Sequence, residues 1–349
     1  MAFYRSRMKL VEIIATVALV IAAVASAGCP NAARNDSIRA ANEGAKAYGQ
    51  KQYDTAITAY KRATEKWNEN HVAWYGLGAA YSGKQDWTNA SDAMAHAVQT
   101  APEQGMYQLL YGWFLYEKAI RLAREDQARR ENKKPEEVNP DLTSVNFEKP
   151  LQHLQEAVKL NPDLWRAHYC IGRIYRDTGK SKEAADELTR ALQSAPTEPG
   201  PWVALAELYR QWDYPDQARQ VAEAGTAVVP GNAEKSDIWY EVGMAYDDKR
   251  LDDKAIDAFS KALEAKRDNH KAKFQRGQAY YRKADYPAAK RDLEEFSKAG
   301  GSSVEFAKQQ ASKMLIDIAA KSVVPGSTPV EKASPEDVVK KAREKGKNR

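Results

Sequence analysis

The sequence predicts an all-α fold, a solenoid of about seven helix–turn–helix units, and three periodic features support this. Glycine recurs every 34 residues, at Gly44, Gly78 and Gly112 and again at Gly243 and Gly277. Small residues follow twelve and nineteen positions after the glycine, where they let two helices approach closely. Proline then closes most units, and it stops a helix because it lacks the amide donor and restricts the preceding residue. The alanines twelve positions on are Ala56, Ala90, Ala184, Ala218, Ala255 and Ala289.

Each unit is predicted to begin with a helix whose buried face carries large side chains around the glycine position. Tryptophan stands four residues before that position in three units, and tyrosine stands three residues after it in five. These offsets fall on one face of an α-helix. The residues concerned are Trp74, Trp202, Trp239, Tyr81, Tyr175, Tyr209, Tyr246 and Tyr280. Packing therefore accounts for most of the aromatic content without a ligand site.

One interval between glycines is long, because 60 residues separate Gly112 from Gly172, which is one period plus 26. The additional segment, about 118–147, contains AIRLAREDQARRENKK, which we expect to lengthen the first helix of the third unit. PEEVNPDLTS follows it, and its prolines end the helix. A charge-rich extension of this kind is typical of a solvated surface.

The combined spacing of Trp, Leu-Gly, Tyr, Ala, Ala and Pro within 34 residues resembles the tetratricopeptide repeat (TPR) family, and residues 74–102 carry nearly every position of it. The resemblance covers 37–302 and implies a right-handed superhelical solenoid of seven units. A following amphipathic segment, 303–321, is expected to cap the last unit. The units are expected to start near Ser37, His71, Gly105, Trp165, Pro199, Ser236 and His270.

The N-terminal 28 residues have the pattern of an export signal or membrane anchor, with basic residues before an uncharged apolar run at 13–27. Three outcomes remain open: cleavage before Gly28, lipidation of Cys29 because 27–29 resembles the end of a bacterial lipobox, or an uncleaved anchor. Each places the folded part in the bacterial cell envelope, facing the periplasm. Residues 29–36 are expected to form a short linker, and 322–349 a disordered basic tail.

The sequence gives little support to catalysis, metal binding or nucleic-acid binding. The net charge of +5 comes from 53 basic and 48 acidic residues, a mixed composition unlike the basic face of a nucleic-acid binder. Two cysteines, Cys29 and Cys170, are too few for a disulfide framework or a structural zinc site. The five histidines form no HExxH motif. We therefore expect no catalytic residues, no metal and no cofactor.

The resemblance implies a concave groove lined by the first helices, with the second, fifth, ninth, twelfth and thirteenth places of each unit pointing into it. These places alternate in the sign of their charge, and the arginines of the fourth unit could hold a partner carboxylate through forked hydrogen bonds. The alternative is that these side chains pair with nearby Asp and Glu. The implied lining residues are Arg166, Tyr169, Arg173, Arg176 and Asp177; Val203, Glu207 and Arg210; Asp237, Tyr240, Met244, Asp247 and Asp248; and Lys271, Phe274, Gln278, Tyr281 and Arg282.

The expected function is a non-catalytic scaffold in the cell envelope, which binds extended or helical segments of partner proteins. It resembles TPR lipoproteins of pilus, secretin or outer-membrane assembly. The alternative is an accessory module that recognises peptidoglycan peptide or glycan. The clamp of the chaperone-binding TPR proteins is not supported, because Ala41, Ala45 and Gly76 occupy the matching places.

Overall fold

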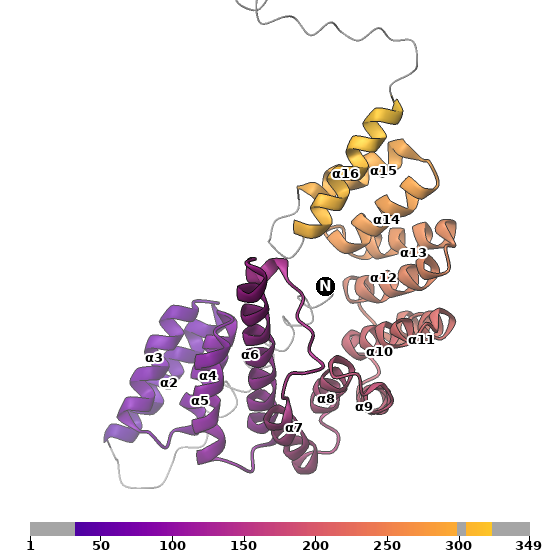
Figure 1. The fold of residues 1–349 in the computed structure, drawn as a ribbon. Helices are drawn as coiled ribbons and strands as arrows, with labels where there is room; N and C mark the ends of the chain where they lie inside the picture. The colour runs from indigo at the N-terminus through magenta and orange to yellow at the C-terminus, as the bar shows by residue number, and fades with distance from the viewer. Residues whose placement is uncertain (1–31, 299–304, 323–349) are drawn as a thin grey trace, which may run out of the picture.

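The computed structural model describes residues 32–298 and 305–322, and in these ranges the chain forms helices and no strand (Figure 1). Seven helix pairs follow one another and a single helix ends the described part, which confirms the predicted all-α solenoid. The pairs are α2 (Ala32–Gly49) and α3 (Tyr53–Lys66), α4 (His71–Gly83) and α5 (Trp87–Thr100), α6 (Gly105–Glu131) and α7 (Glu148–Leu160), α8 (Trp165–Asp177) and α9 (Ser181–Ser194), α10 (Pro199–Gln211) and α11 (Pro215–Val228), α12 (Asn232–Asp248) and α13 (Asp252–Ala265), and α14 (His270–Arg282) and α15 (Tyr286–Ser297), before α16 (Glu305–Ser322).

The array curves, and Figure 1 shows α8, α10 and α12 toward its inner side with α9, α11 and α13 outside them. In these three units the first helix thus lies on the inner face. None of the described helices combines the length and apolarity that crossing a membrane requires. The segment 1–28, Cys29 and the tail beyond Ser322 lie outside the described residues.

Two first helices begin earlier than the sequence register predicts. The helix α2 starts at Ala32, so residues 32–36 are helical where a linker was expected, and α12 starts at Asn232, four residues before Ser236. Residues 32–36 and 232–235 contain no proline, so nothing in them prevents the helix from extending toward its N-terminus. Alanine and long polar side chains in these stretches favour the helix.

The repeated glycine and alanine meet where the two helices of a unit touch. A Cβ added to Gly112 would lie 2.8 Å from the carbonyl oxygen of Pro150, and one added to Gly78 would lie 3.2 Å from that of Ala90. The alanines at this contact are fully buried. Only small residues allow so short an interhelical distance, which explains the period in physical terms.

The inserted segment of the third unit extends α6 to Glu131 and then folds back on it. Asn132 ends the helix in a left-handed conformation at φ 50°. A short 3₁₀ helix, η2 (Pro135–Glu137), follows and contacts α6. Phe147 is buried and its ring lies 5.3 Å from that of Tyr116, so the insertion closes against the array.

Candidate partner-binding face

Several first-helix residues that the sequence implied as groove lining are instead paired with one another between units. Arg176 of α8 donates through Nη1 to Glu207 of α10 at 2.8 Å, and through Nε and Nη2 to Asp177 at 3.1 and 3.0 Å. Its side chain is only 5% exposed. Arg210 of α10 donates to Glu241 of α12 at 3.1 Å and to Asp248 at 2.6 and 3.1 Å.

The pairing continues to the end of the array. Arg282 of α14 bonds with Asp247 of α12 and, at 2.7 Å, with Asp252 of α13. The Tyr281 hydroxyl donates to Asp317 of α16. We call the set Arg176, Glu207, Arg210, Glu241, Asp247 and Arg282 the inter-unit ladder.

The ladder explains why the lining alternates in sign along the sequence. A buried charge is costly unless it is paired and hydrogen-bonded, so each first helix carries the charge that its neighbour needs. For Arg176, Glu207, Arg210 and Asp247 the geometry supports the alternative of internal pairing. Their charges are satisfied inside the array and are not available as the main recognition groups for a partner.

Glu241 has the most perturbed environment in the ladder. It is 1% exposed, and burial, followed by the negative charge of Glu207, raises its pKa to about 8, while Arg210 acts in the opposite direction. Tyr240 beside it is also buried deeply enough that its pKa is raised. The carboxyl of Glu241 therefore holds a proton more tightly than an ordinary glutamate does.

Arg173 of α8 is buried against two aromatic rings of the preceding unit and one of its own helix. Its guanidinium carbon lies 4.7 Å from the Trp113 ring centroid, 5.3 Å from that of Tyr116 and 5.8 Å from that of Tyr169. A guanidinium in this position joins units three and four through cation–π contacts. This position gives Arg173 a packing role between the two units.

Arg166 differs from the other two arginines of α8. Its guanidinium carbon lies 4.2 Å over the ring of Trp165, and no carboxylate in the described ranges forms an ion pair with it. Burial lowers its pKa, because the charge loses hydration, and the negative charge of Glu198 offsets this only in part. Arg166 is thus the arginine of α8 that forms no ion pair within the described residues.

Of the remaining implied lining residues, some pack against their own chain and others stay partly exposed. Phe274 is buried against Phe296, at 4.8 Å between ring centroids, so it belongs to the core. Asp237 accepts from Asn269 at 3.3 Å, and Lys271 lies 5.7 Å over the ring of Tyr240. The residues left half-buried are Val203, Met244 and Gln278.

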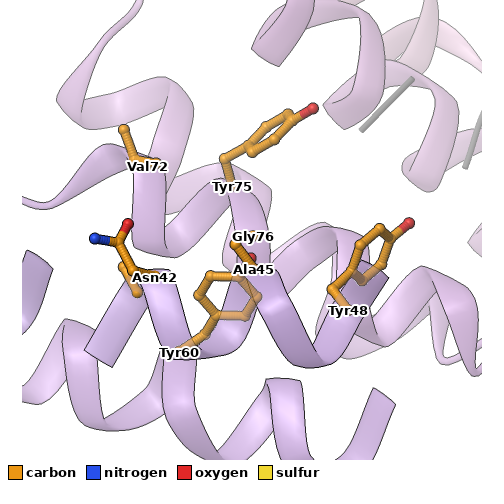
Figure 2. A pocket seen from close by; sticks show the side chains of 8 residues that line it. Asn42, Ala45, Tyr48, Tyr60, Val72, Tyr75 and Gly76 are labelled. Carbon is orange, nitrogen blue, oxygen red and sulfur yellow. The ribbon is translucent and has the colours of Figure 1, made fainter. Parts of the chain in front are cut away.

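A hollow between α2 and α4 was missed by the sequence reasoning. It measures about 20 Å³ and lies where the fifth, ninth and twelfth places of unit one face the second and fifth of unit two (Figure 2). The small residues at Ala41, Ala45 and Gly76 were its signal in the sequence, although they served there only to exclude a clamp. The lining residues are Ala41, Asn42, Ala45, Tyr48, Tyr60, Val72, Tyr75 and Gly76.

The described residues offer no assembled reaction centre. No group of three or more His, Cys, Asp or Glu side chains in the described ranges could hold a metal ion. Burial raises the pKa of the Cys170 thiol to about 12, which leaves it protonated and unreactive. His168 lies at hydrogen-bonding distance from Glu187 and from the carbonyl oxygen of Pro162, at 2.6 and 2.9 Å, which are packing contacts.

Comparisons with known proteins agree with this architecture. Family models described as Tetratricopeptide repeat match residues 42–105, 146–199 and 236–269. A TPR repeat-containing protein of Methanocaldococcus jannaschii is 24% identical over 153 residues, which are 42% of this chain and 27% of that protein. The chain therefore matches about a quarter of the length of this curated relative.

Two solved structures share the fold at low sequence identity. A tetratricopeptide repeat protein from Parabacteroides merdae is 12% identical, with a TM-score of 0.57 over 82% of this chain and 99% of its own. PilW, described as a widely conserved type IV pilus biogenesis factor, is 14% identical, with a TM-score of 0.50 over 68% of this chain and 96% of its own.

Proposed function

The chain is a tetratricopeptide-repeat protein, and from this premise we propose that it is a non-catalytic scaffold of the cell envelope that binds segments of partner proteins on its inner face. The TPR fold supports protein–protein interaction in general. The inner face suits this role because the inter-unit ladder holds α8, α10, α12 and α14 in fixed positions, so little ordering is required when a partner binds.

Arg166 is the observation that carries the proposal. A half-buried guanidinium without an ion pair is unfavourable in the free protein, and a partner carboxylate would recover the lost interaction. Arg173 and Arg176 are engaged by their own chain, so changing them would damage packing as well as binding. Arg166 is therefore the appropriate position for a test.

The test is affinity capture from envelope extracts with wild-type protein and Arg166→Glu. Lys182→Glu is the matched control, because Lys182 is an exposed cation on α9, the outer helix of the same unit. We expect Arg166→Glu to lose at least one discrete protein that the wild type and Lys182→Glu retain. Identical sets of captured proteins from all three would refute binding at this face.

The envelope location rests on the sequence of residues 1–28 and on Cys29, and the similarity of fold to PilW, a type IV pilus biogenesis factor, is a further indication. We propose that Cys29 carries a lipid that attaches the scaffold to a membrane. Membrane fractionation of Cys29→Ser tests this separately. Release of the variant into the soluble fraction is expected, and membrane association that survives the change would disprove lipid attachment.

A further inference from the structure

We propose that the returning part of the insertion, residues 138–146, covers a second partner-binding surface on α6, which takes an extended partner segment with alternating apolar side chains and one carboxylate. We call residues 138–146 the strap, and Ile120, Arg124 and Ala128 of α6 the α6 strip. The inference rests on the proposed function, because it concerns a chain that binds partner segments. It adds a surface on a different unit from that of Arg166.

The helices beside α6 do not reach along its extended part. The helix α5 begins at Trp87, and the hydroxyl of its Thr88 accepts from Arg121 of α6 at 2.9 Å. On another side, α8 ends at Asp177, which accepts from Tyr116 of α6. The inserted segment contacts α6 through η2. Beyond Arg121, α6 is therefore covered by the insertion that follows it in the chain.

The α6 strip is buried although no neighbouring helix lies over it. Ile120 is 7% exposed and Ala128 is 2% exposed, whereas Leu122 on another face of α6 is 45% exposed. Ile120 lies two turns after Trp113 and so on the same face, the face that meets Arg173 of α8. Figure 1 shows the chain between α6 and α7 running back beside α6, toward α8. The strap is thus the cover of the strip.

The strap lies on α6 in the manner of an extended peptide. Val138 and Pro140 are buried and Leu142 is half-buried, whereas the residues between them are exposed. Such alternation is typical of extended backbone, in which successive side chains point to opposite sides. Within the described ranges the strap makes no main-chain hydrogen bond to α6, and its own runs from the Val145 amide to the Leu142 carbonyl oxygen at 3.1 Å. A few apolar side chains hold the strap, so another extended segment can replace it.

Arg124 gives the second, independent observation. It is half-buried, one turn from Ile120 and one turn from Ala128, and its Nε is buried with no hydrogen-bond partner. No carboxylate of the described residues forms an ion pair with Arg124, whereas the neighbouring Arg121 lies 3.4 Å from Glu125. A buried N–H group without an acceptor is unfavourable. The strip therefore presents a cation whose hydrogen-bonding capacity is not filled.

The acidic groups of the inserted segment are engaged elsewhere. Asp141 of the strap accepts from the amide and the hydroxyl of Thr143 at 2.9 and 2.7 Å. Glu137 of η2 accepts from the amide of Lys134 at 3.1 Å. The strap thus fills the apolar part of the strip and leaves Arg124 without an anion. A partner segment that repeats the alternating apolar side chains and adds a carboxylate opposite Arg124 matches both features.

The experiment loosens the strap and asks whether binding improves. Displayed random peptides are selected on the full chain carrying Val138→Ser, and their affinities are then measured for variants. We expect the enriched peptides to carry apolar residues at alternate positions and one Asp or Glu. They should bind Val138→Ser about tenfold more tightly than the wild type, because the strip is open in more of the molecules. Leu122→Ser, at the exposed site on α6, is the matched control and should bind as the wild type does.

Arg124→Gln tests the carboxylate. In the Val138→Ser chain it should weaken binding about ten- to hundredfold, the worth of one hydrogen bond to a charged group. Arg130→Gln, at an exposed site of the same helix, should leave the affinity unchanged. The unfolding temperature of Arg124→Gln should not fall, because the Nε has no partner to lose. This combination distinguishes a binding role from a structural one.

Other results would overturn the inference and leave the proposed function open to its own test. Equal affinities of folded Val138→Ser and the wild type would show that the strap does not compete. Peptides that bind Arg124→Gln undiminished would remove the α6 strip as their site, and their loss in Arg166→Glu would place them on α8, in favour of the proposed function. If Val138→Ser does not fold, Leu142→Ser replaces it with the same expectations, since Leu142 is only half-buried.

Discussion

A buried polar network that occurs twice in the array leads to the sharpest prediction about stability. Asn70 caps α4 by accepting from the amide of Ala73 at 3.1 Å, and its Nδ2 donates to Ser37 Oγ at 2.8 Å. Ser37 in turn donates to the carbonyl oxygen of Ala63 at 2.7 Å. These bonds join the first helix of unit one to the end of its second helix and to the start of unit two.

Replacing Asn70 by alanine should destabilise the protein by about 2 kcal/mol. Loss of a helix N-cap costs about 1 kcal/mol, and loss of a buried neutral hydrogen bond costs about 1 kcal/mol more. Ser37 keeps its bond to the carbonyl of Ala63, so no donor is orphaned by the change. Asn70→Ser retains a capping oxygen but is too short to reach Ser37, and it should cost about 1 kcal/mol.

The same network stands at the other end of the array and provides the matched control. Asn269 donates to Ser236 Oγ at 2.9 Å and caps α14 through the amide of Ala272 at 3.2 Å, while Ser236 donates to the carbonyl oxygen of Ala262 at 2.8 Å. Urea unfolding followed by circular dichroism measures both variants, and Asn269→Ala should lose at least as much as Asn70→Ala, because Asn269 also donates to Asp237 at 3.3 Å. A loss below about 0.5 kcal/mol in both would refute the additive reasoning, because exposed substitutions of no structural consequence fall in that range.

Three further predictions concern close packing and pH. Gly76→Ala should destabilise by about 1–3 kcal/mol because a tyrosine ring occupies the space, whereas Gly49→Ala, with open space around it, should be neutral or stabilising; equal thermal shifts would contradict this. The hydrogen bond to Glu187 raises the pKa of His168 above 6.5, so the stability that this pair contributes is complete below pH 6.5 and is lost as pH rises through the raised pKa; the stability deficit of Glu187→Gln should shrink as pH rises above 6.5, and a constant deficit would count against it. Glu241, with its pKa raised to about 8, makes the wild type lose stability as pH rises through that value. In the same urea assay, the free energy of unfolding of Glu241→Gln should therefore rise relative to that of the wild type between about pH 6 and about pH 9. Parallel pH profiles would show that the carboxyl is already ionised.

The fourth place of the unit shows how far a sequence pattern can be interpreted. Tryptophan is the common residue there, yet the shared feature in the structure is a side-chain nitrogen that reaches the carbonyl oxygen six residues earlier. The residue types differ, but the distances are 2.7 Å for Trp74 and Trp202, 3.0 Å for Gln108 and 2.9 Å for His168. The sequence register located this place correctly, and at His168 the imidazole takes the part of the tryptophan. The hydrogen bond itself could be identified only in the structure.

The sequence predicted the candidate site less well than it predicted the fold. Family register placed Arg166, Arg173 and Arg176 together as a basic lining, and the structure assigns them three different environments: one without an ion pair, one against aromatic rings and one between two carboxylates. Register specifies the face of a helix from which a side chain leaves. It does not specify what the next unit presents at the distance that the side chain can reach.

The sequence by itself determined the helices, their pairing and the order of the units, because these depend on contacts between the two helices of one unit. Small residues allow the close approach at these contacts, as between Gly78 and Ala90 and between Gly112 and Pro150. Only the tertiary structure decided which charges on the inner face are satisfied and where a hollow remains. Arg176 meets Glu207 and Arg210 meets Glu241 across successive units, and the buried hydroxyl of Tyr75 has no hydrogen-bond partner. The physical reason is that such pairings depend on how each unit is rotated against the next, a property of the stacked array that no single repeat contains.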